Sequence, residues 1–88
     1  MNSVDEINTG SNNVKSYIEE CANKYDLKIN NLVYGGVEEK VFFKFKVGNK
    51  WEKIVFAEND IADCAQDESV QSILKRRVEH IIKGLKRS

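Results

Sequence analysis

The chain has 88 residues, of which 41% are hydrophobic and 32% are charged. This length suits one domain and excludes two, and the composition excludes both a membrane-embedded chain and a wholly disordered one. Lys plus Arg and Asp plus Glu number 14 each, so the chain is not a globally basic nucleic-acid binder.

The cysteines and the single histidine set the expectations for metals and compartment. Cys21 and Cys64 form no Cys-x-x-Cys motif, and His80 is the only histidine, so the ligands of a structural zinc site are too few. We expect two reduced thiols, no metal and no cofactor. No apolar run approaches the roughly 18 residues of a membrane helix and no signal peptide pattern opens the chain, so we expect a cytoplasmic location without membrane contact.

The N-terminal region divides into a polar stretch and an amphipathic one. Residues 1–10 are mostly polar and are predicted to form a flexible tail, followed by a single domain over 11–88. From Ser11, a suitable N-cap, apolar residues recur at spacings of three and four, which predicts a helix over about 12–25. These residues are Val14, Ile18, Cys21, Ala22 and Tyr25.

Beyond Asp26 the apolar period changes to two, which is typical of a strand. In this first strand Leu27, Ile29 and Val33 share one side, and Gly35-Gly36 is interpreted as the turn that ends it. The next strand alternates most clearly, over about 41–47, and Gly48-Asn49 predicts a two-residue hairpin turn into a third strand over about 51–57.

The hairpin turn determines which residues of the second and third strands face each other. Phe43 would lie opposite Ile54 and Val41 opposite Phe56 on one side of the sheet. On the other side Phe42 would lie opposite Val55, and Lys46 opposite Trp51.

The C-terminal part is predicted to be helical with one interruption. A short helical stretch opens at Asn59-Asp60 and breaks near Asp67, which can cap a second helix over roughly 68–86. Acidic residues at the start of this last helix and basic residues at its end agree with the helix dipole. Its apolar stripe consists of Val70, Ile73, Leu74, Val78, Ile81, Ile82 and Leu85.

These elements predict an α+β fold with α-β-β-β-α order, in which a three-stranded antiparallel sheet carries both helices on one face. Double-stranded-RNA-binding domains share this order. However, the loop here is Gly35-Gly36-Val37-Glu38-Glu39, and the last helix opens with Asp67-Glu68-Ser69, which would repel phosphate. Both motifs of that family are therefore missing, and we assign the chain to no family on this evidence.

The sheet face away from the helices is the first candidate site. It is predicted to hold more large apolar side chains than a solvated face needs, together with Lys44, Lys46 and Lys53. Aromatic residues are common interface anchors, so a protein partner or a second copy of the chain is expected there. Alternatively, the tail or lysine stems cover these side chains, or the register is shifted by one residue. The predicted protein-binding residues are Tyr34, Phe42, Trp51 and Val55.

The basic end of the last helix is the alternative site. Arg76, Lys83 and Arg87 would form, with His80, a solvent-facing ridge that could follow the phosphates of a nucleic acid. Such a charged face is also what any surface helix presents opposite its apolar stripe. The same reasoning allows single-stranded bases to stack on Phe42 and Trp51.

The sequence offers few candidate catalytic residues. His80 lies in a cationic stretch, and acidic neighbours discourage a thiolate at Cys64. We therefore expect no enzyme but a non-enzymatic interaction module, such as an adaptor, regulator or small inhibitor.

Overall fold

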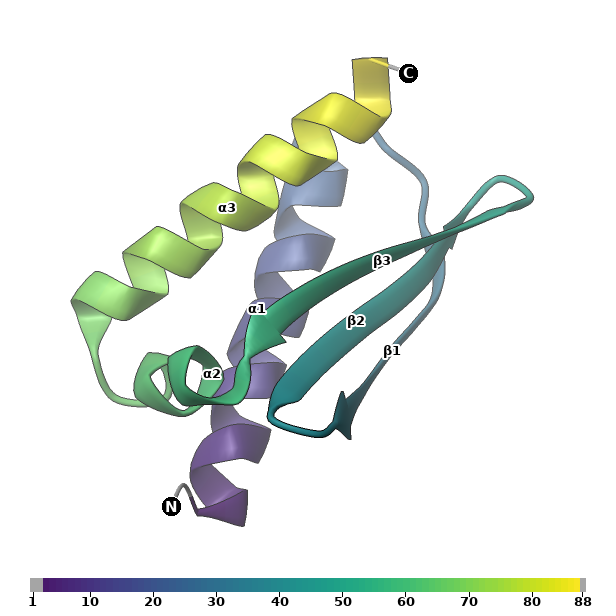
Figure 1. The fold of residues 1–88 in the computed structure, drawn as a ribbon. Helices are drawn as coiled ribbons and strands as arrows, with labels where there is room; N and C mark the ends of the chain where they lie inside the picture. The colour runs from purple at the N-terminus through teal and green to yellow at the C-terminus, as the bar shows by residue number, and fades with distance from the viewer. Residues whose placement is uncertain (1–2, 88) are drawn as a thin grey trace.

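A computed structural model describes residues 3–87 as one sheet with a layer of helices against it (Figure 1). The order is α-β-β-β-α-α, and the sheet is antiparallel with strand order β1-β2-β3. The elements are α1 (Val4–Lys24), β1 (Asn30–Val37), β2 (Lys40–Val47), β3 (Lys50–Ala57), α2 (Glu58–Cys64) and α3 (Glu68–Arg87).

The core lies between this helix layer and one face of the sheet. Buried apolar residues of α1, α2 and α3 form a single cluster with alternate residues of β2 and β3, so the helices cover the same face (Figure 1). This confirms the predicted α+β fold. The sheet supplies Val41, Phe43, Phe45, Ile54 and Phe56 to the cluster.

The predicted β2–β3 register is confirmed. Phe43 pairs with Ile54, and Lys46 pairs with Trp51 across a two-residue turn whose first residue, Gly48, has φ +62°. A positive φ at this position is strained for other residues, which explains the glycine. Uninterrupted alternation on both strands then leaves only one register that buries all the apolar residues of one face.

Helix α1 begins at Val4, eight residues before the predicted start near residue 12, so the prediction of a tail is wrong from Val4 to Gly10. Residues 1 and 2 of that predicted tail lie outside the described residues. The early start of α1 is explained by a capping box. The Ser3 hydroxyl accepts a hydrogen bond from the Glu6 N–H, and the Glu6 carboxylate accepts one from the Ser3 N–H. Ser11 is therefore not an N-cap but a buried residue within the helix.

Gly10 explains why α2 lies so close to α1. A Cβ atom on Gly10 would stand only 1.8 Å from the backbone oxygen of Ile61, a residue that is fully buried in α2. Only a residue without a side chain permits this approach of the two helices. The contact fixes the position of α2 at the end of β3 (Figure 1).

The first strand differs from the prediction because it contains a bulge. The register shifts between Asn30 and Val33, and Asn31 has φ +59°. The extra residue reverses the faces of all later positions, so Val33 is exposed and does not join the core, whereas Tyr34 pairs with Phe43. Before the bulge, Leu27 and Ile29 pack against the core as predicted.

The interpretation of Gly35-Gly36 as a turn is also wrong. Both glycines are paired within β1, opposite Phe42 and Val41, and the turn follows at residues 38 and 39. Glu38, with φ +58°, takes the conformation that a glycine would adopt more easily.

The break near Asp67 separates α2 from α3 as predicted, and the Asp67 carboxylate accepts hydrogen bonds from the Ser69 N–H at 2.9 Å and its hydroxyl at 2.6 Å. These bonds lower the pKa of Asp67. Within the predicted stripe of α3, Leu74, Val78 and Ile82 are buried, but Ile73 is 57% exposed.

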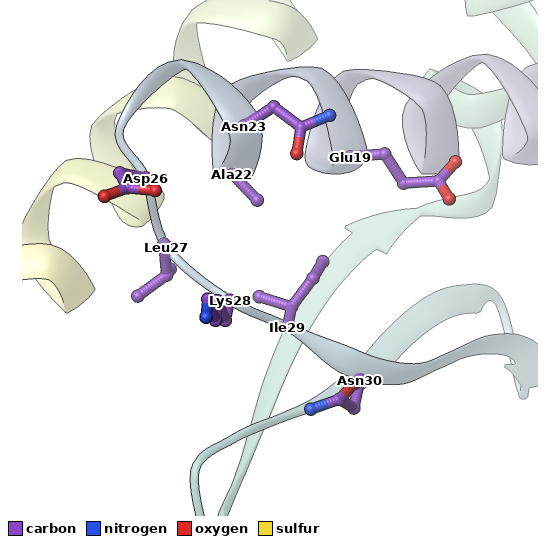
Figure 2. A pocket seen from close by; sticks show the side chains of 8 residues that line it. All are labelled: Glu19, Ala22, Asn23, Asp26, Leu27, Lys28, Ile29 and Asn30. Carbon is purple, nitrogen blue, oxygen red and sulfur yellow. The ribbon is translucent and has the colours of Figure 1, made fainter.

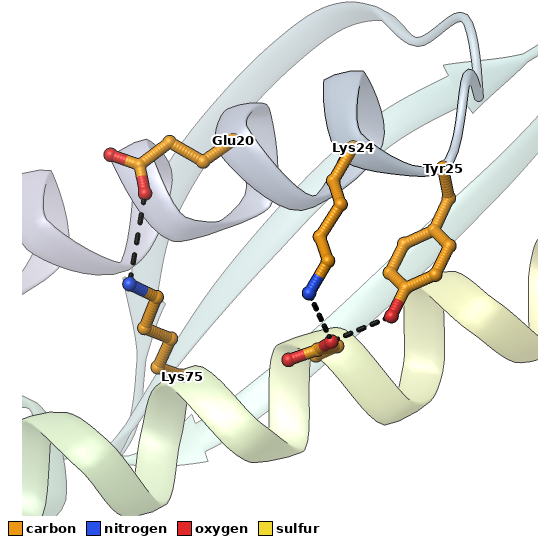
Figure 3. Close-up of polar contacts among 5 residues, drawn as sticks. Glu20, Lys24, Tyr25 and Lys75 are labelled. Carbon is orange, nitrogen blue, oxygen red and sulfur yellow. Dashed lines mark hydrogen bonds and ion pairs between the residues drawn. The ribbon is translucent and has the colours of Figure 1, made fainter.

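Polar contacts join α1 to α3 along their exposed sides (Figure 3). The Glu79 carboxylate accepts from the Tyr25 hydroxyl at 2.6 Å and pairs with Lys24 at 2.9 Å, and Lys75 lies 3.9 Å from Glu20. The hydrogen bond from Tyr25, together with that from Lys24, lowers the pKa of Glu79. Glu79 therefore belongs to the bracing between the two helices.

Candidate functional site

The sheet face opposite the helix layer is the candidate site and is called the open face. Its members follow from the register, because cross-strand partners in an antiparallel sheet point to the same side. Lys44, for example, pairs with both Val33 and Lys53. The open face comprises Asn30, Val33, Gly35 and Val37 of β1, Lys40, Phe42, Lys44 and Lys46 of β2, and Trp51, Lys53, Val55 and Ala57 of β3.

The paired strand positions of the open face carry only positive charge, and Glu38 borders them in the turn after β1. The charged residues of the open face are Lys40, Lys44, Lys46 and Lys53, and none of its twelve register positions holds Asp or Glu. Lys44 and Lys53 are direct cross-strand partners. Like charges directly opposite each other destabilise a sheet, so this pair favours an anion close by.

The lysines gather around two aromatic rings. The ammonium groups of Lys44 and Lys46 lie 4.7 and 5.3 Å from the centroid of the Trp51 ring. Lys53 lies 5.2 Å from the centroid of the Phe42 ring. These distances fall within cation–π range, so each ring holds ammonium groups beside its surface.

Phe42 lies across the neighbouring strand, over Gly35. A Cβ atom at Gly35 would stand 2.8 Å from Cζ and 3.0 Å from Cε2 of the Phe42 ring, so the ring occupies the space above this residue. Glycine at this position of β1 thus leaves room for the ring and does not form a turn. Beside the ring is a shallow hollow lined by Val37, Glu38, Lys40, Phe42, Lys53 and Val55.

Large apolar groups on the open face remain exposed. The exposed fraction is 46% for Trp51, 52% for Val33 and 58% for Val37. The N-terminal region from Val4 onward is part of the helix layer and leaves this face uncovered. Lysine side chains cover the rings only in part.

The structure brings three of the four predicted protein-binding residues together. Phe42 and Val55 are cross-strand partners, and Trp51 lies on the same face. Tyr34 does not, because the bulge at Asn31 turns it toward the helix side, where its ring centroid is 5.8 Å from that of Phe43. The sequence reasoning missed Val33 and Val37, although Asn30-Asn31, a pair tolerant of positive φ, was a signal for the bulge.

The predicted nucleic-acid-binding residues lie elsewhere. Arg76, Lys83 and Arg87 are exposed on α3, in the layer on the other side of the sheet from the open-face lysines. The ammonium group of Lys83 lies 5.7 Å from the centroid of the Tyr25 ring, and its positive charge attracts the Glu79 carboxylate. This ridge therefore has an acidic neighbour and cannot form one surface with the strand lysines.

One further basic residue, Arg77, belongs to the edge of the sheet. Its guanidinium donates to the backbone oxygen of Val55 at 3.0 Å and lies 4.6 Å from the centroid of the Phe56 ring. This contact covers the outer edge of β3 and discourages pairing with another strand there.

A groove between the end of α1 and residues 27–30 is the other concavity of interest (Figure 2). Glu19 and Asn23 project from α1 above Leu27 and Ile29, and Asp26 and Asn30 stand at its ends. Its lining residues include no histidine, cysteine, serine or tyrosine, and its charged side chains are Glu19, Asp26 and Lys28.

The two cysteine side chains are buried. Cys21 and Cys64 are free thiols whose pKa values are raised by burial, which disfavours the nucleophilic thiolate. Burial, together with Cys64 at 3.9 Å, raises the pKa of Tyr17 to about 12. Within residues 3–87 no group of three or more His, Cys, Asp or Glu side chains is arranged to hold a metal ion.

Comparisons with protein-family models, with curated proteins and with solved structures found no match to this chain. Among the described residues, no helix has both the length and the apolar character that crossing a membrane demands.

Proposed function

We propose that the chain is a non-enzymatic interaction module that binds a partner through the open face. The observation that supports this most strongly is the exposure of Trp51, Val33 and Val37 on the side of the sheet that faces away from the core. Several exposed aromatic and aliphatic groups on one sheet face are characteristic of an interaction surface, and here they extend from Trp51 at one end of the face to Val37 at the other.

The chemistry of the open face favours binding over catalysis. Lysines and rings provide charge attraction and apolar contact, but the face contains no histidine, cysteine or paired carboxylates that could move a proton or attack a substrate. The thiols of Cys21 and Cys64 are buried under the other face. The proposed role is therefore recognition of a macromolecule.

The test compares three immobilised baits in a lysate of the native host. These are the wild-type chain, the double variant Phe42→Ala/Trp51→Ala, and the control Arg76→Gln/Lys83→Gln, which changes the helix layer. The proposal predicts that wild type and control retain the same molecule and that the double variant loses it while its circular dichroism stays native. Analytical ultracentrifugation covers the case in which the partner is a second copy. Equal retention and equal mass for all three chains would contradict the proposal.

A further inference from the structure

Building on the proposed function, we infer that the partner of the open face is a single-stranded nucleic acid. Its phosphates would lie on Lys40, Lys44, Lys46 and Lys53, and its bases would stack on Phe42 and Trp51.

The distribution of charge selects the open face for a polyanion. Removing its four lysines from the 14 Lys and Arg residues leaves 10 basic side chains against all 14 Asp and Glu residues. A polyanion is thus attracted to this face and opposed by the net charge of the remaining surface. The opposed Lys44 and Lys53 would also lose their mutual repulsion when a phosphate lies between them.

The rings provide the second element of the site. Phe42 extends across Gly35 along the sheet surface, and Trp51 is 46% exposed at the other end of the face. Ammonium groups stand within 5.3 Å of both ring centroids. A ligand that repeats a negative charge and a planar ring in every unit matches this alternation, because bases stack on aromatic side chains while phosphates pair with lysines.

This combination distinguishes a single strand from other polyanions. In a duplex the bases are stacked on one another and cannot reach Phe42 or Trp51, and the side chains of Asp and Glu carry no aromatic ring that could stack on them. The row from Lys40 to Lys46 spans about 20 Å at roughly 3.3 Å per strand residue, which several nucleotides can cover.

The first experiment measures the affinity of the full chain for labelled oligothymidylate of about 12 nucleotides by fluorescence anisotropy. Four phosphate contacts predict a slope of about −3 in a plot of log affinity against log salt, which is about 50-fold weaker binding at about 200 mM than at about 50 mM salt. Trp51 is the only tryptophan, so quenching of its fluorescence reports stacking directly.

Matched variants locate the ligand. Trp51→Ala and Phe42→Ala should each weaken binding at least about fivefold, the effect of losing one stacked base, whereas Trp51→Phe should retain most of it. Lys44→Gln should reduce the salt slope by about 0.7, and Lys83→Gln, an equal change of charge on α3, should leave affinity and slope unchanged.

Three results would overturn the inference: no binding at low salt, equal affinity for duplex or poly-glutamate, or a loss of binding on Lys83→Gln comparable to that on Lys44→Gln. The proposed function has a separate readout. If the bait experiment yields a partner that survives nuclease treatment and is lost with Phe42→Ala/Trp51→Ala, the open face is a docking surface but its ligand is a protein. If wild-type and variant baits retain the same molecules, the proposed function itself fails.

Discussion

The close approach of α1 and α2 makes Gly10→Ala the sharpest test of the fold that presents the open face. The new methyl group would stand 1.8 Å from the Ile61 oxygen and 2.8 Å from its carbonyl carbon. Non-bonded carbon and oxygen atoms are ordinarily about 3.5 Å apart, so α1 and α2 must move apart by roughly 1 Å or more to admit the methyl group. Because the obstacle is backbone of a fully buried residue, no side chain can rotate to make room.

The magnitude follows from two opposing effects. Overpacking of this kind costs about 3 kcal/mol, and alanine gains about 1 kcal/mol over glycine inside a helix, so the variant should lose about 2 kcal/mol of stability. For a domain of this size that corresponds to a melting temperature lower by about 10 °C. Gly84→Ala is the matched control, because a Cβ atom there would meet nothing within 4 Å.

The assay is thermal and urea unfolding followed by circular dichroism. Gly84→Ala should raise the stability by about 1 kcal/mol, since only the gain in helix propensity applies. The two glycine substitutions should thus move the melting temperature in opposite directions. If Gly10→Ala were as stable as the wild type, the contact between α1 and α2 described above would be wrong.

Two further predictions concern the open face and the bracing of the helices. Gly35→Ala should leave the fold intact but displace the Phe42 ring, which would alter the aromatic NMR shifts of that ring. Gly36→Ala should leave the ring in place, because the nearest atom to its new Cβ would be 3.7 Å away. Identical Phe42 ring shifts in both variants would contradict this prediction. The pKa of Glu79 is lowered in the fold from its usual value of 4.5, chiefly by the hydrogen bond from Tyr25. The carboxylate therefore stabilises the protein fully at pH values above 4.5, and this contribution is lost as the pH falls through the lowered pKa of the folded state. Urea midpoints should therefore be lower for Glu79→Gln than for wild type at neutral pH and converge in acid; a gap that persists at low pH would argue against this role.

The parts of the fold that could be predicted are those in which one regular pattern runs without interruption. Strict alternation from Val41 to Val47, a glycine turn and the apolar positions of β3 left a single register that buries one face. The stripe of α3 was long enough to define its helix and its buried side. Phe42, Trp51 and Val55 could therefore be placed on one face from the sequence.

The parts that failed depend on single residues or on contacts distant in sequence. One bulge at Asn31 reversed the faces of Val33 and Tyr34, and periodicity does not register an extra residue of this kind. The polar composition of the first ten residues concealed the capping box of Ser3, and the role of Gly35 becomes visible only when Phe42 lies across it. The lysines of β2 and β3 could be placed on the open face from the sequence, but its β1 members, Val33 and Val37 among them, appeared only once the bulge was known.

Lysine footprinting tests the central claim, that the open face is the binding surface, most directly. The free chain and the chain with saturating ligand, either the oligothymidylate or a partner captured from the host, are acetylated briefly and the modified lysines are quantified by mass spectrometry. We predict protection of the four open-face lysines and unchanged labelling of Lys24, Lys75, Lys83 and Lys86, which lie on the helices. Protection of the helix lysines with the open-face lysines still labelled would contradict the account.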